Sequence, residues 1–302
     1  MRIFLATCEN FRHYQCASVA GIKNVLFSYY HLELKSKNTP TLFRLMNERK
    51  QKVICDSGLF TMMFGAGKGN TYTYDDLVKY TKGYIANAQK FGVEDLTIVE
   101  MDTHKILPLQ NLFEFRKHFE DSGMKVLYVW HNEEGIDGLY RMAEKYEYIA
   151  LSVPELRVLC TGKKVRYQDV VNDLLYKIKR NTTRMPKVHL LGNTVMETME
   201  NGLGYSCDSS SWTYGIRHSR TTFYQDGKLM QRYLGRETSA EWHQKFQAAV
   251  DEILESNPEA KAMLEGQTAN YRIYMSNLIF SALSHKMYQN SLNLKFPYEE
   301  RV

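Results

Sequence analysis

Short apolar runs rich in β-branched residues alternate with amphipathic stretches along most of this chain. Seven such runs are expected to form strands: Ile3–Ala6, Lys52–Cys55, Leu96–Met101, Val126–Trp130, Tyr148–Ser152, Val188–Leu191 and Gly204–Cys207. The intervening stretches with helical spacing are Tyr74–Phe91, Leu109–Asp121, Glu133–Lys145, Tyr167–Arg180 and Val195–Asn201. Alternation of strands with helices favours a parallel sheet, because parallel neighbours need a crossover connection.

The number of strands favours a closed barrel over an open sheet. Seven strands with helices between them, in a chain of 302 residues, indicate an α/β fold of the (β/α)8 TIM type. The eighth strand is not evident. Thr221–Tyr224 and Lys228–Gln231 flank Gln225-Asp226-Gly227 and are more typical of a hairpin, so we expect a barrel that is irregular at its last strand.

The chain is expected to contain one barrel domain with a helical tail. We place the barrel at residues 1–239, and a C-terminal helical extension, packed on or beside it, at residues 240–302. Helical patterns in that extension cover Ala240–Ser256 and Thr268–Leu292. The sequence leaves open whether this tail packs on the barrel, forms a homodimer or contacts DNA.

Composition excludes several classes of protein. No apolar run approaches the roughly 20 residues that cross a bilayer, and the apolar N-terminus is too short for a signal peptide, so we expect a cytoplasmic protein without a membrane partner. The five cysteines are scattered and form neither a disulfide framework nor a Cys-x-x-Cys site. We therefore expect no metal and no cofactor.

Positive charge is concentrated in one segment of a chain whose net charge is +5. Between Arg157 and Lys187 lie nine basic residues against only two acidic ones. The six basic residues considered for nucleic-acid binding are Lys163, Lys164, Arg166, Lys177, Lys179 and Arg180. A solvated helix face and a phosphate-binding surface both explain such a segment, and charge alone does not separate them.

Polar side chains follow five of the expected strands. They are Asp56 with Ser57, Asp102, His131, Ser152 with Glu155, and Asp208. Each of them alone is compatible with a helix cap. In a parallel barrel, however, the carboxyl ends of all strands meet at one rim, where catalytic groups lie. Carboxylates gathered at a barrel mouth are costly unless they bind or react with something.

These residues resemble the motifs of the tRNA-guanine transglycosylase superfamily, over roughly residues 50 to 215. The shorter DpdA-type enzymes of bacteriophages, which insert 7-deazaguanines into DNA, are the most similar. Asp56-Ser57-Gly58-Leu59-Phe60-Thr61 is similar to the family's Asp-Ser-Gly-Gly-Phe-Gln segment. The segments 150–155, 189–192 and 204–208 are similar to its Gly-Leu-Ser/Ala-Val-Gly-Glu segment, the strand before the nucleophile and the segment ending in the nucleophilic aspartate.

The resemblance implies a role for each matching position. Asp208 would be the nucleophile and Asp56 the general base. The base-binding residues would be Ser57, Phe60, Asp102, His131, Ser152 and Glu155, with Phe60 stacking on the base and Asp102 pairing with its guanine edge. Two displacements at one sugar carbon would exchange guanine for a preQ0-like base and retain the anomeric configuration.

Departures from the family pattern affect the expected substrate. Leu59 and Thr61 replace glycine and glutamine, and the zinc module of the tRNA enzymes is absent after Asp208. The absence favours DNA over tRNA as partner, with the 7-deazaguanine base as co-substrate and, for a viral protein, the host cytoplasm as location. A tRNA-directed transglycosylase and a non-catalytic barrel that binds nucleic acid or a deazapurine remain the alternatives.

Overall fold

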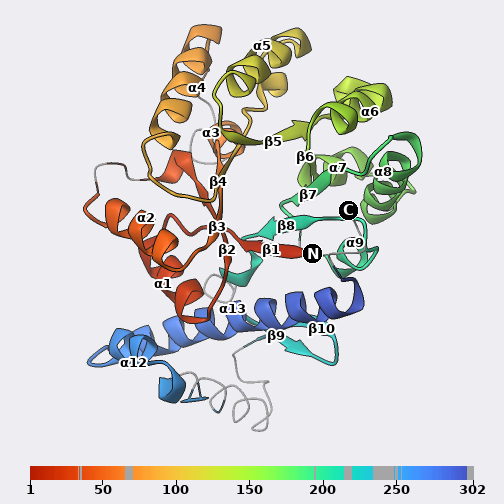
Figure 1. Cartoon of the computed structure of the whole chain (residues 1–302). Helices are drawn as coiled ribbons and strands as arrows, with labels where there is room; N and C mark the ends of the chain where they lie inside the picture. Colours follow the sequence, from red (N-terminus) through yellow and green to blue (C-terminus); the bar gives the residue numbers. More distant parts are fainter. Residues whose placement is uncertain are drawn as a thin grey trace.

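A computed structural model describes residues 1–32, 34, 36–64, 71–193, 195–213, 220–233, 248, 251–252 and 254–297. Eight parallel strands form a closed barrel in chain order, so the expected (β/α)8 fold is confirmed (Figure 1). The strands are β1 (Arg2–Leu5), β2 (Asn24–Ser28), β3 (Lys52–Asp56), β4 (Leu96–Val99), β5 (Lys125–Trp130), β6 (Tyr148–Ser152), β7 (Lys187–Leu191) and β8 (Ser206–Ser209).

Helices follow the strands and form the outer layer of the barrel (Figure 1). They are α1 (Phe11–Val19), α2 (Asn38–Glu48), α3 (Leu59–Phe64), α4 (Tyr74–Ala88), α5 (Leu109–Glu120), α6 (Gly135–Lys145), α7 (Val153–Cys160), α8 (Tyr167–Asn181) and α9 (Met196–Met199). Short 3₁₀ turns η1 (Tyr29–His31), η2 (Thr103–Lys105), η3 (Asn132–Glu134) and η4 (Ser211–Thr213) lie at four strand ends.

The strand that sequence analysis missed lies early in the chain rather than at its end. It is β2, which pairs in parallel with both β1 and β3. Its residues are mostly buried, so it forms a short apolar run without alternation, and it follows closely on the apolar end of α1. The expectation of an irregular last strand was wrong, because β8 pairs with β1 over all four of its residues, including Phe4 with Asp208.

Most expected element bounds were right to within three residues. Strand β4 ends at Val99, so Glu100 and Met101 belong to the turn that follows. Helix α6 begins at Gly135 rather than Glu133, because η3 precedes it. The expected hairpin is confirmed as β9 (Arg220–Gln225) and β10 (Lys228–Tyr233), an antiparallel pair outside the barrel.

The inside of the barrel is filled by a small apolar cluster that defines which residues point inward. It contains Phe4, Ala6, Leu26, Ile54, Val99, Leu127, Val129 and Ala150. Alternate residues of a strand face the same side. Asp56 follows Ile54 by two positions on β3, so its side chain faces the barrel interior at the carboxyl end. A larger cluster between strands and helices forms the main core.

The C-terminal part places one long helix against the side of the barrel. After α12 (Pro258–Leu264), α13 (Ala269–Lys295) contacts α1, β1 and β9, and Figure 1 shows it running along one edge of the ring. The N-terminal amine donates a hydrogen bond to Asn293 Oδ1 at 2.5 Å, and Ile3 N–H donates to Gln289 Oε1 at 2.7 Å. Most of the expected helix Ala240–Ser256, and the expected boundary at residue 239, lie outside the described residues. No helix in the described ranges is long and apolar enough to cross a membrane.

Candidate functional site at the carboxyl end of the barrel

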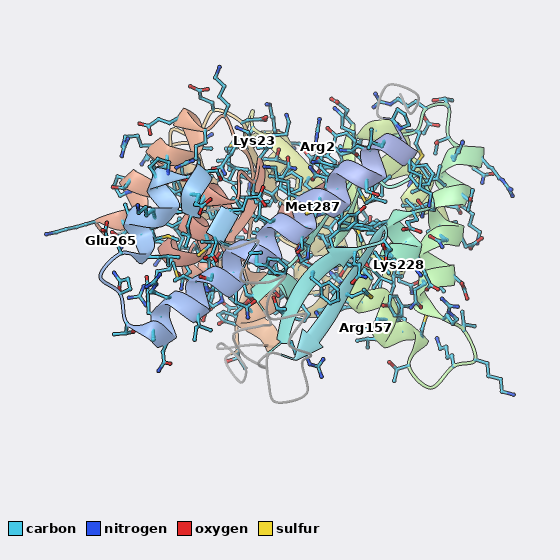
Figure 2. All side chains as sticks on the ribbon, turned by 90° about the horizontal axis from the view of Figure 1, so that it is seen from below. Arg2, Lys23, Arg157, Lys228, Glu265 and Met287 are labelled. Carbon is cyan, nitrogen blue, oxygen red and sulfur yellow. The ribbon has the colours of Figure 1, made fainter. Side chains whose placement is uncertain are left out.

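The two ends of the barrel differ chemically. Figure 2 views the molecule from the side of α13 and shows Arg2, at the start of β1, and Arg157, after β6, toward opposite edges. The carboxyl ends of the strands therefore lie at the edge that carries Arg157. The predicted catalytic and base-binding residues all lie in the last residues of strands or after them at this end, which we call the mouth.

Asp56 ends β3 with its side chain in the mouth. Its Oδ2 accepts a hydrogen bond from Gly58 N–H at 3.1 Å, in a tight turn that leads into α3. Gly58 has φ +79°, and a side chain there would also collide with Tyr30, so the turn requires glycine. The sequence Asp-Ser-Gly thus fixes the direction of the Asp56 carboxyl.

The pKa of Asp56 depends on the groups that surround it. Burial, and after it the negative charges of Asp102 and Asp208, raise the pKa of the Asp56 carboxyl to about 7. A charge perturbs a pKa only from nearby. The three aspartates, which follow or end β3, β4 and β8, therefore share one mouth, although Asp56 and Asp208 lie far apart in the chain.

The Asp208 carboxylate accepts hydrogen bonds from one backbone donor and one side-chain donor. Its Oδ1 accepts hydrogen bonds from Gly192 N–H at 2.9 Å and from His189 Nε2 at 3.1 Å. The other ring nitrogen of His189 lies 2.7 Å from Ser206 Oγ, which lies 2.6 Å from the hydroxyl of Tyr148. Both of these hydrogen bonds to Asp208 use Oδ1, and Oδ2 accepts none within the described residues.

A cavity of about 360 Å³ opens beside Asp102. Phe60, Pro154, Val158 and Leu159 supply an apolar wall. The polar and charged lining residues are Asp102, Lys105, Glu133, Ser152, Glu155 and Arg157. Phe60 is 60% exposed although it is aromatic. The volume falls at the lower end of the roughly 300–1,000 Å³ of small-molecule sites, and apolar walls with a few polar groups are typical of them.

The buried His131 pairs with the half-buried Glu155 at the edge of this cavity. His131 Nδ1 lies 3.3 Å from Glu155 Oε2, and the His131 side chain is fully buried. Burial opposes protonation of His131, but the hydrogen bond that His131 donates to Glu155 and the charge of Asp102 outweigh it and raise the pKa of His131. Burial likewise opposes ionisation of Glu155, and its hydrogen bonds with His104 and His131 nevertheless lower its pKa.

Ser57 does not join the cavity. Its side chain is buried, and its Oγ accepts a hydrogen bond from Leu59 N–H at 3.4 Å. Its carbonyl oxygen accepts a hydrogen bond from the Tyr80 hydroxyl at 2.7 Å. Of the predicted base-binding residues, Phe60, Asp102, Ser152 and Glu155 line the cavity, His131 lies behind Glu155, and Ser57 supports the turn.

The six predicted nucleic-acid-binding residues are exposed but lie in two groups. Lys163, Lys164 and Arg166 are in the loop before α8, which starts at the mouth side, since α8 returns antiparallel to the strands. Lys177, Lys179 and Arg180 are near the end of α8, about 20 Å along the helix at 1.5 Å per residue. The fold therefore brings only the first group near the mouth, where Arg166 pairs with Glu197.

Three residues of the mouth were not found from the sequence. Glu9 follows β1, and its negative charge contributes to the raised pKa of Asp56. The rule that found the other strand ends applied to Glu9 as well. His189 lies within β7 and His104 within η2. Their roles depend on contacts across the barrel that spacing in one chain does not reveal.

A second cavity, of about 420 Å³, lies at the amino end of the barrel. Five of its seven charged residues pair with one another: Asp95 bonds both Lys52 and Lys125, and Lys187 pairs with Glu147. Of the other two, Lys145 pairs with Glu120, and Arg2 donates a hydrogen bond to the Tyr205 hydroxyl. In barrels of this type the reacting groups come from the carboxyl ends of strands. We therefore take the mouth as the candidate active site.

Fold and site together define the chain as a (β/α)8 barrel with three aspartates in its carboxyl mouth. Comparison with known proteins assigns no family: no protein-family model matches the chain, and no curated protein matches it.

Proposed function

We propose that the protein is a base-exchange transglycosylase that replaces guanine in DNA with a 7-deazaguanine base through a covalent glycosyl-aspartate intermediate. The observation that carries the proposal is the gathering of Asp56, Asp102 and Asp208 in one mouth, which helps to raise the pKa of Asp56 to about 7. Like charges held together in this way lower the stability of the fold. Such an arrangement is typical of a reactive site.

Asp208 is the proposed nucleophile. Its Oδ2 attacks C1′ of the target nucleotide while the C1′–N9 bond breaks and guanine leaves with the bonding electrons. An oxocarbenium-like transition state favours a carboxylate at this position. The donors on Oδ1, Gly192 N–H and His189 Nε2, fix the carboxylate without occupying the attacking oxygen.

Asp56 is the proposed acid and base. A carboxyl with a pKa of about 7 is present in both protonation states near neutral pH. The protonated form delivers its proton to the leaving guanine. The resulting carboxylate then takes the N9 proton of the incoming 7-deazaguanine, whose N9 attacks C1′ and releases Asp208. The proton given to guanine is thus replaced by the one taken from the incoming base, and the exchange needs no cofactor.

The cavity beside Asp102 is the proposed base pocket. Phe60 offers an exposed ring face, and Asp102 accepts hydrogen bonds that N1–H and the exocyclic amine of a guanine-like base can donate. Ser152 and Glu155 line the same cavity. A base within a duplex does not reach such a pocket, so the target nucleotide must flip out. We expect the exposed basic group before α8, residues 163–166, to contact its backbone.

The test is incorporation of a labelled base. The full chain is incubated with duplex DNA, single-stranded DNA or tRNA and with labelled guanine or 7-deazaguanines, and the nucleosides are analysed by mass spectrometry. We expect incorporation into DNA, none with Asp208→Asn, and normal incorporation with the exposed control Asp121→Asn.

The alternatives give different outcomes. Incorporation into tRNA alone would replace the DNA proposal with the tRNA one. Binding of DNA or deazaguanine without any incorporation would identify a non-catalytic barrel and contradict the proposed chemistry.

A further inference from the structure

Two histidines and a glutamate from three successive strand ends meet beside the mouth. His104 lies in η2 after β4, His131 follows β5, and Glu155 lies in the first turn of α7 after β6. One nitrogen or oxygen atom from each lies within 4.8 Å of the others. The imidazole rings stack with centroids 3.6 Å apart and 29° between their planes. Three potential ligands for a metal ion are therefore in one place.

The separations within this cluster suit a shared ion. His104 Nε2 lies 3.0 Å from Glu155 Oε1, and His131 Nδ1 lies 3.3 Å from Glu155 Oε2. Two ligand atoms on one tetrahedral Zn²⁺, with bonds of about 2.0–2.1 Å, lie about 3.3 Å apart. The cluster therefore requires only small side-chain movements to accept an ion between these atoms.

Burial distinguishes the cluster from an ordinary surface pair. The side chain of His131 is fully buried, and that of His104 is 1% exposed. The hydrogen bonds to Glu155 use one nitrogen of each ring. The second nitrogen, Nδ1 of His104 and Nε2 of His131, is buried with no hydrogen-bond partner in the described part of the chain. The ion would bind the two nitrogens that now face Glu155, so these second nitrogens are not counted among its ligands.

Charge around the cluster also suits a divalent cation. Glu133 Oε2 lies 3.9 Å from His104 Nε2, which makes it a candidate fourth ligand. Two neutral imidazoles and two carboxylates would balance two positive charges. Lys105 now neutralises part of this charge by pairing with Glu133 and by lying 3.5 Å from Glu155 Oε1. A lysine is a flexible cation that can move outward into solvent.

We propose that His104, His131 and Glu155 bind one divalent transition-metal ion, with Glu133 or water completing the coordination. One ring nitrogen from each histidine and the Glu155 carboxylate would be the ligands. Imidazole with carboxylate suits Zn²⁺ and its neighbours in the first transition row, whereas Mg²⁺ and Ca²⁺ prefer all-oxygen sites. The ion would tie together the segments after β4, β5 and β6. This proposal does not depend on base exchange, and it departs from the expectation of a metal-free protein.

Metal binding by the purified full chain tests it. After treatment with a chelator, the protein is dialysed against Zn²⁺ or Mg²⁺, and bound metal is measured by elemental mass spectrometry. We expect saturable binding of one Zn²⁺ per chain and no comparable binding of Mg²⁺. His104→Gln and Glu155→Gln should each weaken zinc binding by more than about 100-fold, because even changes behind the ligands cost 10- to 100-fold.

A matched histidine serves as the control. His118 lies on α5 with an edge contact to Phe115, so His118→Gln should bind zinc as the wild type does. Co²⁺ gives a second measurement that needs no variant: it should produce a d–d absorption spectrum that Zn²⁺ abolishes. Absence of saturable Zn²⁺ and Co²⁺ binding by the wild type, or equal binding by His104→Gln and Glu155→Gln, would overturn the proposal.

Discussion

One carboxylate at each end of the barrel has contrasting neighbours: Asp95 at the amino end and Asp56 at the mouth. At the amino end, Lys52 and Lys125 share Asp95 at 2.9 and 3.0 Å, and Lys187 also has an acidic partner. At the mouth, Asp56 faces the like charges of two other aspartates, Asp102 and Asp208, and it has no basic partner in the described chain. Paired charges at an exposed end contribute little to stability, whereas gathered like charges oppose it. The difference indicates that the mouth is arranged for function.

The largest effect is expected from Asp208→Asn. If Asp208 is the nucleophile, its amide should lower the rate of exchange by at least about 10⁴-fold, as removal of a nucleophile does in other enzymes. Base binding, measured by calorimetry with a 7-deazaguanine, should change little. Exchange at the wild-type rate would show that the mouth uses another group.

Asp56→Asn should lower activity but raise stability above neutral pH. We expect exchange to fall by about 10²–10⁴-fold, since a general acid–base is lost. Stability should rise at pH 8. The pKa of Asp56 is 3.8 ordinarily and about 7 in the fold, so the folded protein holds a proton that the unfolded chain releases between these values. Wild-type stability therefore falls as pH rises from about 4 to 7 and stays lower above it.

Denaturant unfolding at pH 5 and pH 8 measures this difference. The substitution removes the charge that is costly at pH 8, and we expect a gain on the order of 2 kcal/mol there and a smaller one at pH 5. Equal changes at both pH values would mean that Asp56 ionises normally.

His189→Asn should have an intermediate effect. His189 is a positioning residue in this account, because it bonds Asp208 Oδ1 and leaves Oδ2 free. We expect a loss of about 10- to 100-fold in kcat with a smaller change in KM, as misplacement of a reacting group produces. Single-turnover kinetics, which follow formation of the covalent intermediate, test it. A change in KM alone would assign His189 to binding.

The smallest effect is expected at the amino end. Asp95→Asn breaks the pairs with Lys52 and Lys125, whose side chains are 43% and 66% exposed. Such pairs contribute about 0–1 kcal/mol, so thermal unfolding should shift slightly and exchange should not change. Loss of exchange in this variant would contradict the division of roles between the two ends.

The fold and the central carboxylates could be predicted from the sequence because both depend on local patterns. Apolar runs followed by Asp56 and Asp208 identify strand ends, and barrel topology then brings strand ends to one rim. Strand β2 escaped because its five residues are almost all buried and carry no alternation. His189 was not predicted as a site residue because it lies inside a strand. Its role depends on which face of the strand it occupies and on its neighbour on β8, and the sequence shows neither.

The cluster around Glu155 shows a second limit. Glu155 and His131 were predicted singly, as residues after strands, but the stacking of His104 on His131 depends on how two turns lie across the rim. Spacing along the chain does not determine that arrangement. The sequence likewise did not show that the basic segment is divided in space. The charges near Lys163 and those near Arg180 lie toward opposite ends of the barrel, because α8 runs back along it.

Titration of the Asp56 carboxyl tests the central claim most directly. Carbon-13 NMR of carboxyl-labelled aspartates gives its pKa in the wild type, in Asp102→Asn and in Asp208→Asn. A value near 7 in the wild type that falls in each variant would establish that the three side chains share one mouth. An Asp56 that titrates near its ordinary value of 3.8 and ignores both substitutions would contradict the account.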